Sequence, residues 1–337
     1  AFDEIETLTG PPYLGRLAGS PGGQAAGDYI AERFAAYGLR PVGGDGTYFQ
    51  PFPLTYSRLT AMPQLSVTGP AGVDHTYQAR RDFAPMVTRF MGGGQAAGPV
   101  IWANECSHAD FDYTDVVNKV VLCWDRLLRQ RREDVGRNAL EHGAAGLLLL
   151  FDPGEARPFD RMAPNRPAWV PEPIPTLRIS ETVAHDLLSG TGLTLADLTT
   201  ALLPLPLSTT VRLEVPLQID ESAQGRNVLG VLPGRDPAHK EEVVILGAHY
   251  DHVGEDPNGV IWPGANDNAS GVAALLETAR SWQAQGYVPR RTVLFAAWDG
   301  EEIGLDGSRH YVEAPRYPLT NTVAMLQLDM IGAGEDT

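Results

Sequence analysis

The fold is decided by the stretch Val243-Val244-Ile245-Leu246-Gly247-Ala248-His249-Tyr250-Asp251, which passes from a wholly apolar run into polar side chains. A strand that is apolar at every position is typical of a parallel sheet buried on both faces. Val293-Leu294-Phe295-Ala296-Ala297 has the same character, and Met325-Leu326-Gln327-Leu328 is apolar except at Gln327. We therefore predict three buried strands in this region, with a fourth strand over residues 227–232.

A predicted helix lies between the first two of these strands. Val272, Leu275, Leu276 and Ala279 recur at the period of a helix over Gly271 to Trp282. Strands that alternate with a helix indicate an α/β fold with an open mixed, largely parallel sheet flanked by helices. Upstream, Ser20 and Gly38 bound a predicted helix over residues 20–38, and prolines bound predicted edge strands within residues 48–70.

The middle of the chain differs in character. Glycines 92–94 and Gly98-Pro99 punctuate it, and we expect Val100-Ile101-Trp102 to begin a strand. Further strands are predicted at 120–124 and 147–151, a helix at 131–142, and a loop rich in proline and arginine at 153–175. We interpret residues 85–210 as an inserted smaller α/β domain, which leaves residues 1–84 and 211–337 as the two parts of the catalytic domain.

Composition excludes several classes of protein. The 337 residues carry a formal net charge of −16, which argues against binding to nucleic acid. No apolar run approaches the ~20 residues of a membrane-spanning helix. The start at Ala1 lacks the basic and apolar regions of a signal peptide. Cys106 and Cys123 allow one disulfide at most, and the sequence leaves open whether they pair.

Polar side chains follow each of the three apolar strands. His249, Asp251 and His252 follow the first, Asp299, Glu301 and Glu302 the second, and Asp329 the third, while Asp267 precedes the helix. Ligands of open α/β sheets bind beyond the carboxyl ends of the strands. So many carboxylates at one buried edge would repel each other, and a divalent cation would offset that repulsion. Imidazole with carboxylate oxygens suits zinc, manganese or cobalt, and a carboxylate that bridges two metals explains the surplus of acids.

Adjacent residues just past a strand end point in different directions. One of Glu301 and Glu302 can thus bind metal while the other serves as general base toward water. Each residue also has a structural alternative. His249 could be a packed core histidine, Asp267 could cap a helix N-terminus, and Asp329 could be a turn residue. The convergence of four short motifs favours the metal site over these alternatives.

These motifs resemble those of the co-catalytic di-zinc exopeptidases, which include bacterial leucyl aminopeptidases, aminopeptidase Y and glutamate carboxypeptidases. The resemblance rests on residues 249–251, 264–271, 299–308 and 328–332, covers 225–337 closely and covers 1–60 more loosely. Residues 85–210 resemble the protease-associated domain that many members carry as an insertion, because Gly143-Ala144-Ala145-Gly146 precedes an apolar strand as in that domain.

The resemblance implies a role for each residue of two zinc sites. His249 and Asp329 would bind one Zn²⁺, Glu302 would bind the other, and Asp267 would bridge them. Glu301 would be the general base, and Asp251 would orient the histidine and the base. His252 and His310 match no ligand position and are interpreted as structural or surface residues.

One departure from the family pattern concerns the last ligand. The family supplies a further histidine from a strand well beyond the Asp329 motif, whereas this sequence ends at Thr337. We expect the second zinc to be weak or absent, or a second polypeptide to supply the C-terminal part of the fold.

The leading hypothesis is a metallo-aminopeptidase that hydrolyses N-terminal residues from peptides. A glutamate-type carboxypeptidase or dipeptidase on the same site is the nearest alternative, and a single-zinc glutaminyl cyclase is weaker. A catalytically incomplete fragment that acts only as a binding module is the alternative from another class. Relatives with the insertion are commonly exported, so a secreted or periplasmic location is expected. Glycines 92–94 do not indicate a dinucleotide-binding site, because Pro99 follows where that site needs a helix to begin. No Gly-x-Ser-x-Gly motif occurs, which argues against a serine hydrolase.

Overall fold

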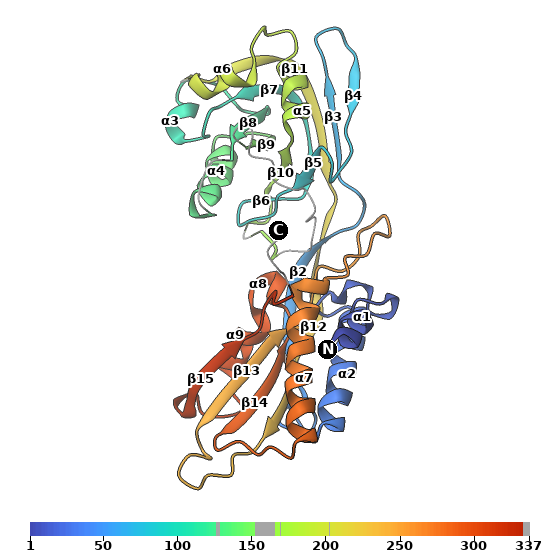
Figure 1. The fold of residues 1–337 in the computed structure, drawn as a ribbon. Coiled ribbons are helices and arrows are strands. Elements are labelled where there is room, and N and C mark those ends of the chain that lie inside the picture. The colour runs from blue at the N-terminus through green and yellow to red at the C-terminus, as the bar shows by residue number, and fades with distance from the viewer. Residues whose placement is uncertain (126–128, 152–165, 169, 202, 333–337) are drawn as a thin grey trace. The chain divides into compact units, whose positions relative to one another are not determined.

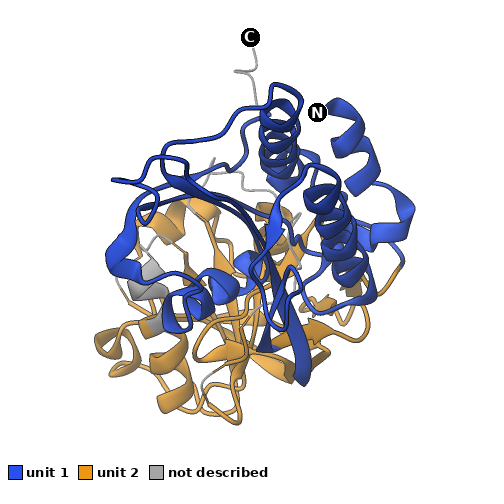
Figure 2. Ribbon diagram, turned by 90° about the horizontal axis from the view of Figure 1, so that it is seen from below, with its two compact units in different colours: residues 1–55, 220–255, 259–337 blue, residues 56–219, 256–258 orange. Residues whose placement is uncertain are grey.

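The computed structural model describes residues 1–125, 129–151, 166–168, 170–201 and 203–332 (Figure 1). The chain divides into two compact units, coloured separately in Figure 2: unit 1 comprises residues 1–55, 220–255 and 259–337, and unit 2 comprises residues 56–219 and 256–258. Unit 2 begins earlier and ends later than the predicted insertion of residues 85–210. No helix in the described part of the chain has the length and apolar character needed to cross a membrane.

Unit 1 is built on a mixed sheet. Its strands are β1 (Arg40–Pro41), β2 (Phe49–Leu59), β12 (Leu217–Leu232), β13 (Val243–His249), β14 (Thr292–Trp298) and β15 (Thr322–Gln327), of which β2 and β12 continue into unit 2. The order is β1-β12-β14-β13-β15, with β2 also paired to β12. Because β13 runs parallel to both β14 and β15, the carboxyl ends of these three strands lie at one edge.

Helices and short turns surround this sheet. They are α1 (Phe2–Leu8), η1 (Pro11–Arg16), α2 (Pro21–Ala36), η2 (Ala265–Ser270), α7 (Gly271–Ala284), α8 (Glu301–Gly304), α9 (Asp306–Glu313) and η3 (Leu319–Asn321). The predicted helix over 20–38 is confirmed as α2: the Ser20 hydroxyl accepts a hydrogen bond from the Gly23 amide, and Gly38 follows with φ of 74°. The helix predicted over 271–282 is confirmed as α7.

The alternation of side chains between the two faces of a strand explains why β14 is apolar from Val293 to Trp298. Val293, Phe295 and Ala297 face a core formed with α2 and α7. Leu294, Ala296 and Trp298 face a second core that includes Tyr311 of α9. Both faces of the strand are therefore covered, as a strand of this composition requires.

The strand predicted at 325–328 forms, but the prediction that it is buried is wrong. β15 forms next to β13, but Val323, Met325 and Leu326 are each about half exposed. The strand is the last in the order of the sheet, so the described residues pair with it on one side only. Apolar composition thus predicted the strand correctly and its environment incorrectly.

Unit 2 has its own sheet, in the order β4-β3-β11-β7-β8-β9-β10-β5, with β6 paired to β10. Its strands are β3 (Gln64–Thr68), β4 (Asp74–Thr76), β5 (Phe83–Pro85), β6 (Met91–Gly92), β7 (Gly94–Trp102), β8 (Val120–Trp124), β9 (Gly146–Leu150), β10 (Ile174–Ile179) and β11 (Leu205–Val215). Its helices are α3 (His108–Phe111), α4 (Arg129–Glu141), α5 (Glu181–Leu187) and α6 (Leu195–Thr200). A separate core, with Trp102 and Trp124 in edge-to-face contact at 5.0 Å, stabilises this sheet.

The expectation that a strand begins at Val100 is wrong. β7 begins at Gly94, and residues 100–102 are its last three. Pro99 is tolerated inside the strand because pairing with β8 starts only at Val100, so on that side its missing N–H leaves no partner unsatisfied. Most of the predicted loop at 153–175 lies outside the described residues, and β10 begins at Ile174.

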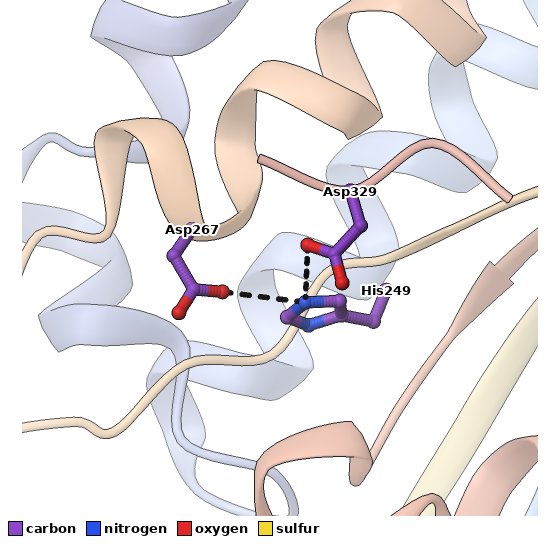
Figure 3. A group of neighbouring side chains, drawn as sticks. All are labelled: His249, Asp267 and Asp329. Atoms are coloured by element: carbon purple, nitrogen blue, oxygen red, sulfur yellow. Dashed lines mark ion pairs between the residues drawn. The ribbon is translucent and has the colours of Figure 1, made fainter. Parts of the chain in front are cut away.

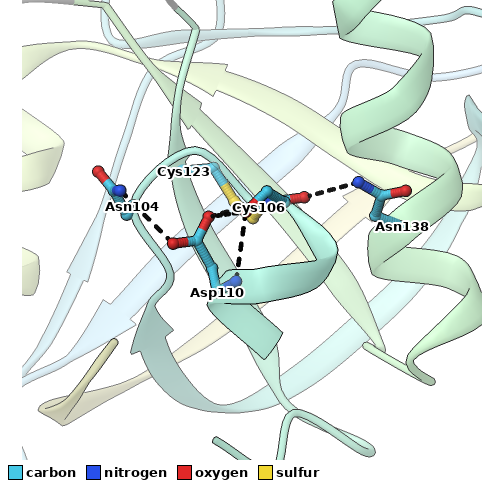
Figure 4. The surroundings of a disulfide bond; sticks show 6 residues. Asn104, Cys106, Asp110, Cys123 and Asn138 are labelled. Atoms are coloured by element: carbon cyan, nitrogen blue, oxygen red, sulfur yellow. Dashed lines mark hydrogen bonds between the residues drawn. A yellow bond between two sulfur atoms is a disulfide. The ribbon is translucent and has the colours of Figure 1, made fainter. Parts of the chain in front are cut away.

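The two cysteines, whose pairing the sequence left open, form a disulfide in unit 2. Cys106 and Cys123 have Cα atoms 5.8 Å apart, and both are buried (Figure 4). The Asn138 amide of α4 donates a 3.1 Å hydrogen bond to the carbonyl oxygen of Cys106. The bond therefore joins the segment before α3 to β8, with α4 held against the same segment.

Candidate metal centre

All of the residues singled out by the sequence lie near one edge of the sheet of unit 1. His249 ends β13 and Asp251 follows it, while Glu301 and Glu302 open α8 directly after β14. Asp329 lies two residues beyond the end of β15. The parallel pairing of these strands brings their carboxyl ends together, which is the location that open α/β sheets use for ligands.

One group of side chains surrounds the ring of His249. Its Nε2 lies 3.3 Å from Asp267 Oδ1 and 3.4 Å from Asp329 Oδ1 (Figure 3). Glu301 Oε2 is 4.0 Å from the same nitrogen. The donor atoms of His249, Asp267 and Asp329 lie within 4.8 Å of one another, close enough for one metal ion to contact all three.

A second group shares Asp267 with the first. It consists of His252, Asp267 and Glu302, whose donor atoms also lie within 4.8 Å of one another. His252 Nδ1 is 2.7 Å from Glu302 Oε1, and both side chains are buried. His252, which the sequence indicated to be a structural or surface residue, lies within this group. Its position three residues after His249, beyond the same strand end, was the available signal.

Asp251 lies against both the histidine and the backbone of Glu301, the two groups that the sequence expected it to orient. His249 Nδ1 lies 3.2 Å from the backbone oxygen of Asp251 and 3.6 Å from its carboxylate. That fully buried carboxylate also accepts hydrogen bonds from the backbone amides of Glu301, at 3.0 Å, and Glu302, at 3.1 Å. Asp251 therefore fixes the first turn of α8, where a negative charge also interacts favourably with the helix dipole.

The residue that caps the start of α7 is Asn268 and not its neighbour Asp267. Asn268 Oδ1 accepts hydrogen bonds from the amides of Gly271, at 3.0 Å, and Met330, at 3.2 Å. Its Nδ2 donates to the Leu328 carbonyl oxygen at 2.9 Å. Asn268 is fully buried and ties the η2 turn, which carries Asp267, to the segment that carries Asp329. Nothing in the local sequence around Asn268 indicated this role.

Burial and charge shift the protonation of this site. Burial lowers the pKa of His249, but hydrogen bonds to Asp251 and Asp267 and the charge of Glu301 outweigh it and raise the pKa to about 11. Burial raises the pKa of Glu301, the charge of His249 opposes this rise, and Asp251, Glu302 and Asp329 add to it. Burial, with Asp251 beside it, also raises the pKa of Asp299 to about 7. These shifts reflect several acids at a buried edge.

A cavity of about 180 Å³ adjoins the first group. It is lined by Trp298, Asp299, Glu301, Leu305, Ser308, Met325, Gln327 and Asp329. Glu301 and Asp329 thus face a space that is partly apolar, large enough for a small side chain, and contained within unit 1.

Comparisons with known proteins bear on this part of the chain. Residues 227–337 match Peptidase family M28. The Probable lipoprotein aminopeptidase LpqL of Mycobacterium tuberculosis is 32% identical over 244 residues, which are 72% of this chain and 42% of that protein. An aminopeptidase of Pseudomonas aeruginosa is 30% identical over 328 residues, 94% of this chain and 54% of that protein. The chain thus spans about half the length of these two relatives.

Solved structures share the fold. That of BSAP, a zinc aminopeptidase from Bacillus subtilis, has a TM-score of 0.59 and 22% sequence identity, covering 98% of this chain and 68% of that one. The family match covers every residue of the two groups described above. Residues 227–337 of this chain therefore form a region of peptidase family M28, and the two relatives described above are named aminopeptidases.

Proposed function

We propose that this chain carries the catalytic centre of a zinc-dependent exopeptidase that hydrolyses N-terminal residues from peptides. The observation that carries the proposal is the sharing of Asp267 between two groups of metal-binding side chains. A carboxylate common to two such groups is the arrangement that a pair of metal ions needs. The relatives named aminopeptidases favour N-terminal hydrolysis over other reactions of a two-metal site.

The donor atoms fit zinc. In this proposal His249 and Asp329 hold one ion, Glu302 holds the other, and Asp267 is common to both. His252 is an additional candidate for the second ion, because it shares a group with Asp267 and Glu302. Imidazole and carboxylate donors are those that zinc prefers when thiolates are absent. When bound, zinc supplies Lewis-acid activation of the scissile carbonyl and of water.

The remaining chemistry belongs to the side chains. Glu301 is partly exposed and adjoins the cavity, so substrate and water can reach it. Its raised pKa suits a carboxylate that takes a proton from attacking water and then delivers it to the leaving amine. Asp251 fixes the backbone of Glu301 and Glu302, so the base and the ligand keep their separate directions.

A carboxypeptidase would need a cation free to hold the C-terminal carboxylate of its substrate. Arg16 is buried near Asp251, Asp267 and Glu302, but it directs four hydrogen bonds to backbone carbonyl oxygens. It is therefore committed within the protein, and no observation favours the carboxypeptidase over the aminopeptidase.

The direct test compares two substrates and one variant. We expect hydrolysis of a leucyl anilide but not of an acidic, N-blocked dipeptide, and loss of that hydrolysis with a zinc chelator. Glu301→Gln should lower kcat by about 10²- to 10⁴-fold while zinc remains bound, because only the proton transfer is removed. Glu313→Gln, the same change at an exposed site on α9, is the matched control and should keep full activity.

Four results would contradict the proposal. Cleavage of only the N-blocked substrate would assign the carboxypeptidase activity instead. Hydrolysis that survives the chelator, or a Glu301→Gln variant with unchanged kcat, would remove the metal centre or the base from the mechanism. Zinc binding without hydrolysis of either substrate would favour a binding module.

Two accompanying proposals concern the rest of the chain. Residues 85–210 are proposed to be a protease-associated insertion, supported by the separate core and sheet of unit 2. The protein is proposed to act outside the cytoplasm, because it contains a buried disulfide, a bond that persists in oxidising compartments. A relative named as a lipoprotein supports the same location.

A further inference from the structure

Arg16 is a fully buried arginine in unit 1, at the end of η1. Its Nε donates to the Tyr250 carbonyl oxygen at 2.8 Å, and its Nη2 donates to that of Gly264 at 2.9 Å. Its Nη1 donates to the carbonyl oxygens of Leu8, at 2.8 Å, and Pro263, at 2.7 Å. The guanidinium plane thus joins three segments of backbone that are far apart in sequence.

Two of these segments carry the metal-binding side chains. Tyr250 lies between His249 and Asp251, so the bond from Nε fixes the backbone at the end of β13. Gly264 immediately precedes the η2 turn that carries Asp267. Arg16 therefore sets the spacing between the segment of His249 and the segment of the shared carboxylate.

The third segment explains why a cation belongs there. Leu8 is the last residue of α1, and the carbonyl oxygens at a helix C-terminus have no partner within the helix. These oxygens form the negative end of the helix dipole, which a buried positive charge stabilises. The Arg16 side chain thus donates hydrogen bonds to the end of α1 and to both segments that carry metal-binding side chains.

The backbone around Arg16 adds a second connection to the site. The amide of His252 donates to the Arg16 carbonyl oxygen at 3.1 Å, and that of Gly254 donates to the Gly15 carbonyl oxygen at 3.0 Å. Gly15 has φ of 69°, and a Cβ there would lie 2.4 Å from the Gly254 carbonyl oxygen. The turn can approach the segment of His252 this closely because residue 15 is glycine.

Charge supports the same role. Burial lowers the pKa of Arg16 to about 10, while Asp251, Asp267 and Glu302 act to raise it. The side chain therefore stays positive at neutral pH and offsets part of the repulsion among those acids.

We propose that Arg16 is a positioning residue of the metal centre, which holds the segments at 250–252 and 263–264 in place before any ion binds. The inference rests on the proposed metal centre and deepens it. Arginine is required because its planar fork reaches several carbonyl oxygens at once, whereas the ammonium of lysine is a single point with three rotatable donors.

The test uses Arg16→Lys, which keeps the positive charge but removes the planar guanidinium group and its fixed set of N–H donors. Arg280→Lys is the matched control, because Arg280 is a half-exposed residue of α7 in the same unit and pairs with Glu277 within one helix. In the metal-free protein, we expect faster amide hydrogen exchange at 249–254 and 264–269 in Arg16→Lys only. Zinc affinity, measured by competition with a chromophoric chelator, should fall about 10- to 100-fold, the usual effect of losing a group that orients ligands.

Cobalt provides a readout that a purely structural role would not change. The visible absorption of the Co²⁺-loaded protein reports ligand geometry, and it should differ between Arg16→Lys and the control. Unchanged exchange at both segments would overturn the proposal. Faster exchange with unchanged zinc affinity and an unchanged cobalt spectrum would overturn the link to the metal centre. If the unaltered protein binds no zinc, the proposed function fails, while hydrogen exchange still tests the connection made by Arg16.

Discussion

The imidazole of His249 is only 1% exposed and lies beside the carboxylates of Asp251, Asp267 and Asp329. Burial lowers the pKa of the ring, but hydrogen bonds to Asp251 and Asp267 and the charge of Glu301 outweigh burial and raise that pKa in the metal-free fold from 6.5 to about 11. A raised pKa stabilises the metal-free fold fully below pH 6.5, and this stabilisation is lost as the pH rises through 11. A metal ion needs the neutral ring and must displace the proton.

The predicted consequence is proton release on zinc binding. Between pH 7 and pH 9, one displaced proton should raise the zinc affinity about tenfold per pH unit. Calorimetry in buffers of different ionisation enthalpy measures the released protons directly. His310→Gln, on α9, should keep this dependence of zinc affinity on pH. His249→Gln should lose binding of the ion that His249 and Asp329 are proposed to hold. A pH-independent affinity over that range would show that His249 is neutral before zinc arrives.

Sequence and structure differ most for residues whose role depends on a distant partner. The proximity of His249, Asp267, Glu302 and Asp329 was predictable because each lies in a short motif after or before a strongly apolar element. Asn268 was missed, because its hydrogen bonds reach the backbone at Leu328 and Met330, about 60 residues away. Arg16 was missed for the same reason, since its partners at 250 and 263–264 are more than 230 positions away.

At the scale of elements, periodicity predicted which strands and helices form. The run at 293–297 is a fully buried strand, the run at 243–246 is a strand in which Val244 and Leu246 are only partly buried, and the helix at 271–282 is present. Burial of β15 and the start of β7 were not predictable in this way. Exposure of β15 depends on the neighbours of the strand, and the tolerance of Pro99 depends on where β8 begins to pair.

The disulfide is an element-scale constraint with a measurable effect. It closes a loop of 17 residues in unit 2, and a loop of this length contributes about 3 kcal/mol by restricting the unfolded chain. The double variant Cys106→Ala/Cys123→Ala should therefore lower the free energy of unfolding by about that amount, as measured by urea denaturation.

Reduction supplies the control for this prediction. A strong reductant should lower the stability of the unaltered protein to that of the double variant and leave the variant unchanged. Equal stabilities of the oxidised protein and the variant would show that the bond does not contribute.

At the scale of the whole chain, the two units differ in what they carry. Unit 1 contains the metal-binding groups, Arg16 and the cavity, whereas unit 2 contains the disulfide. Their cores are formed by separate sets of side chains. Separate cores are the property that lets parts of one chain unfold as independent cooperative units.

This separation predicts two thermal transitions that respond to different changes. Zinc binds only folded unit 1 in the proposed site, so free zinc at 100 times its Kd should stabilise that transition by about 2.7 kcal/mol. The double cysteine variant should instead lower the transition of unit 2 alone. Scanning calorimetry of both proteins, with and without zinc, tests both shifts at once. If zinc and the cysteine variant move the same transition, the two units unfold together, and stability gained at the metal centre is shared by the unit that holds the disulfide.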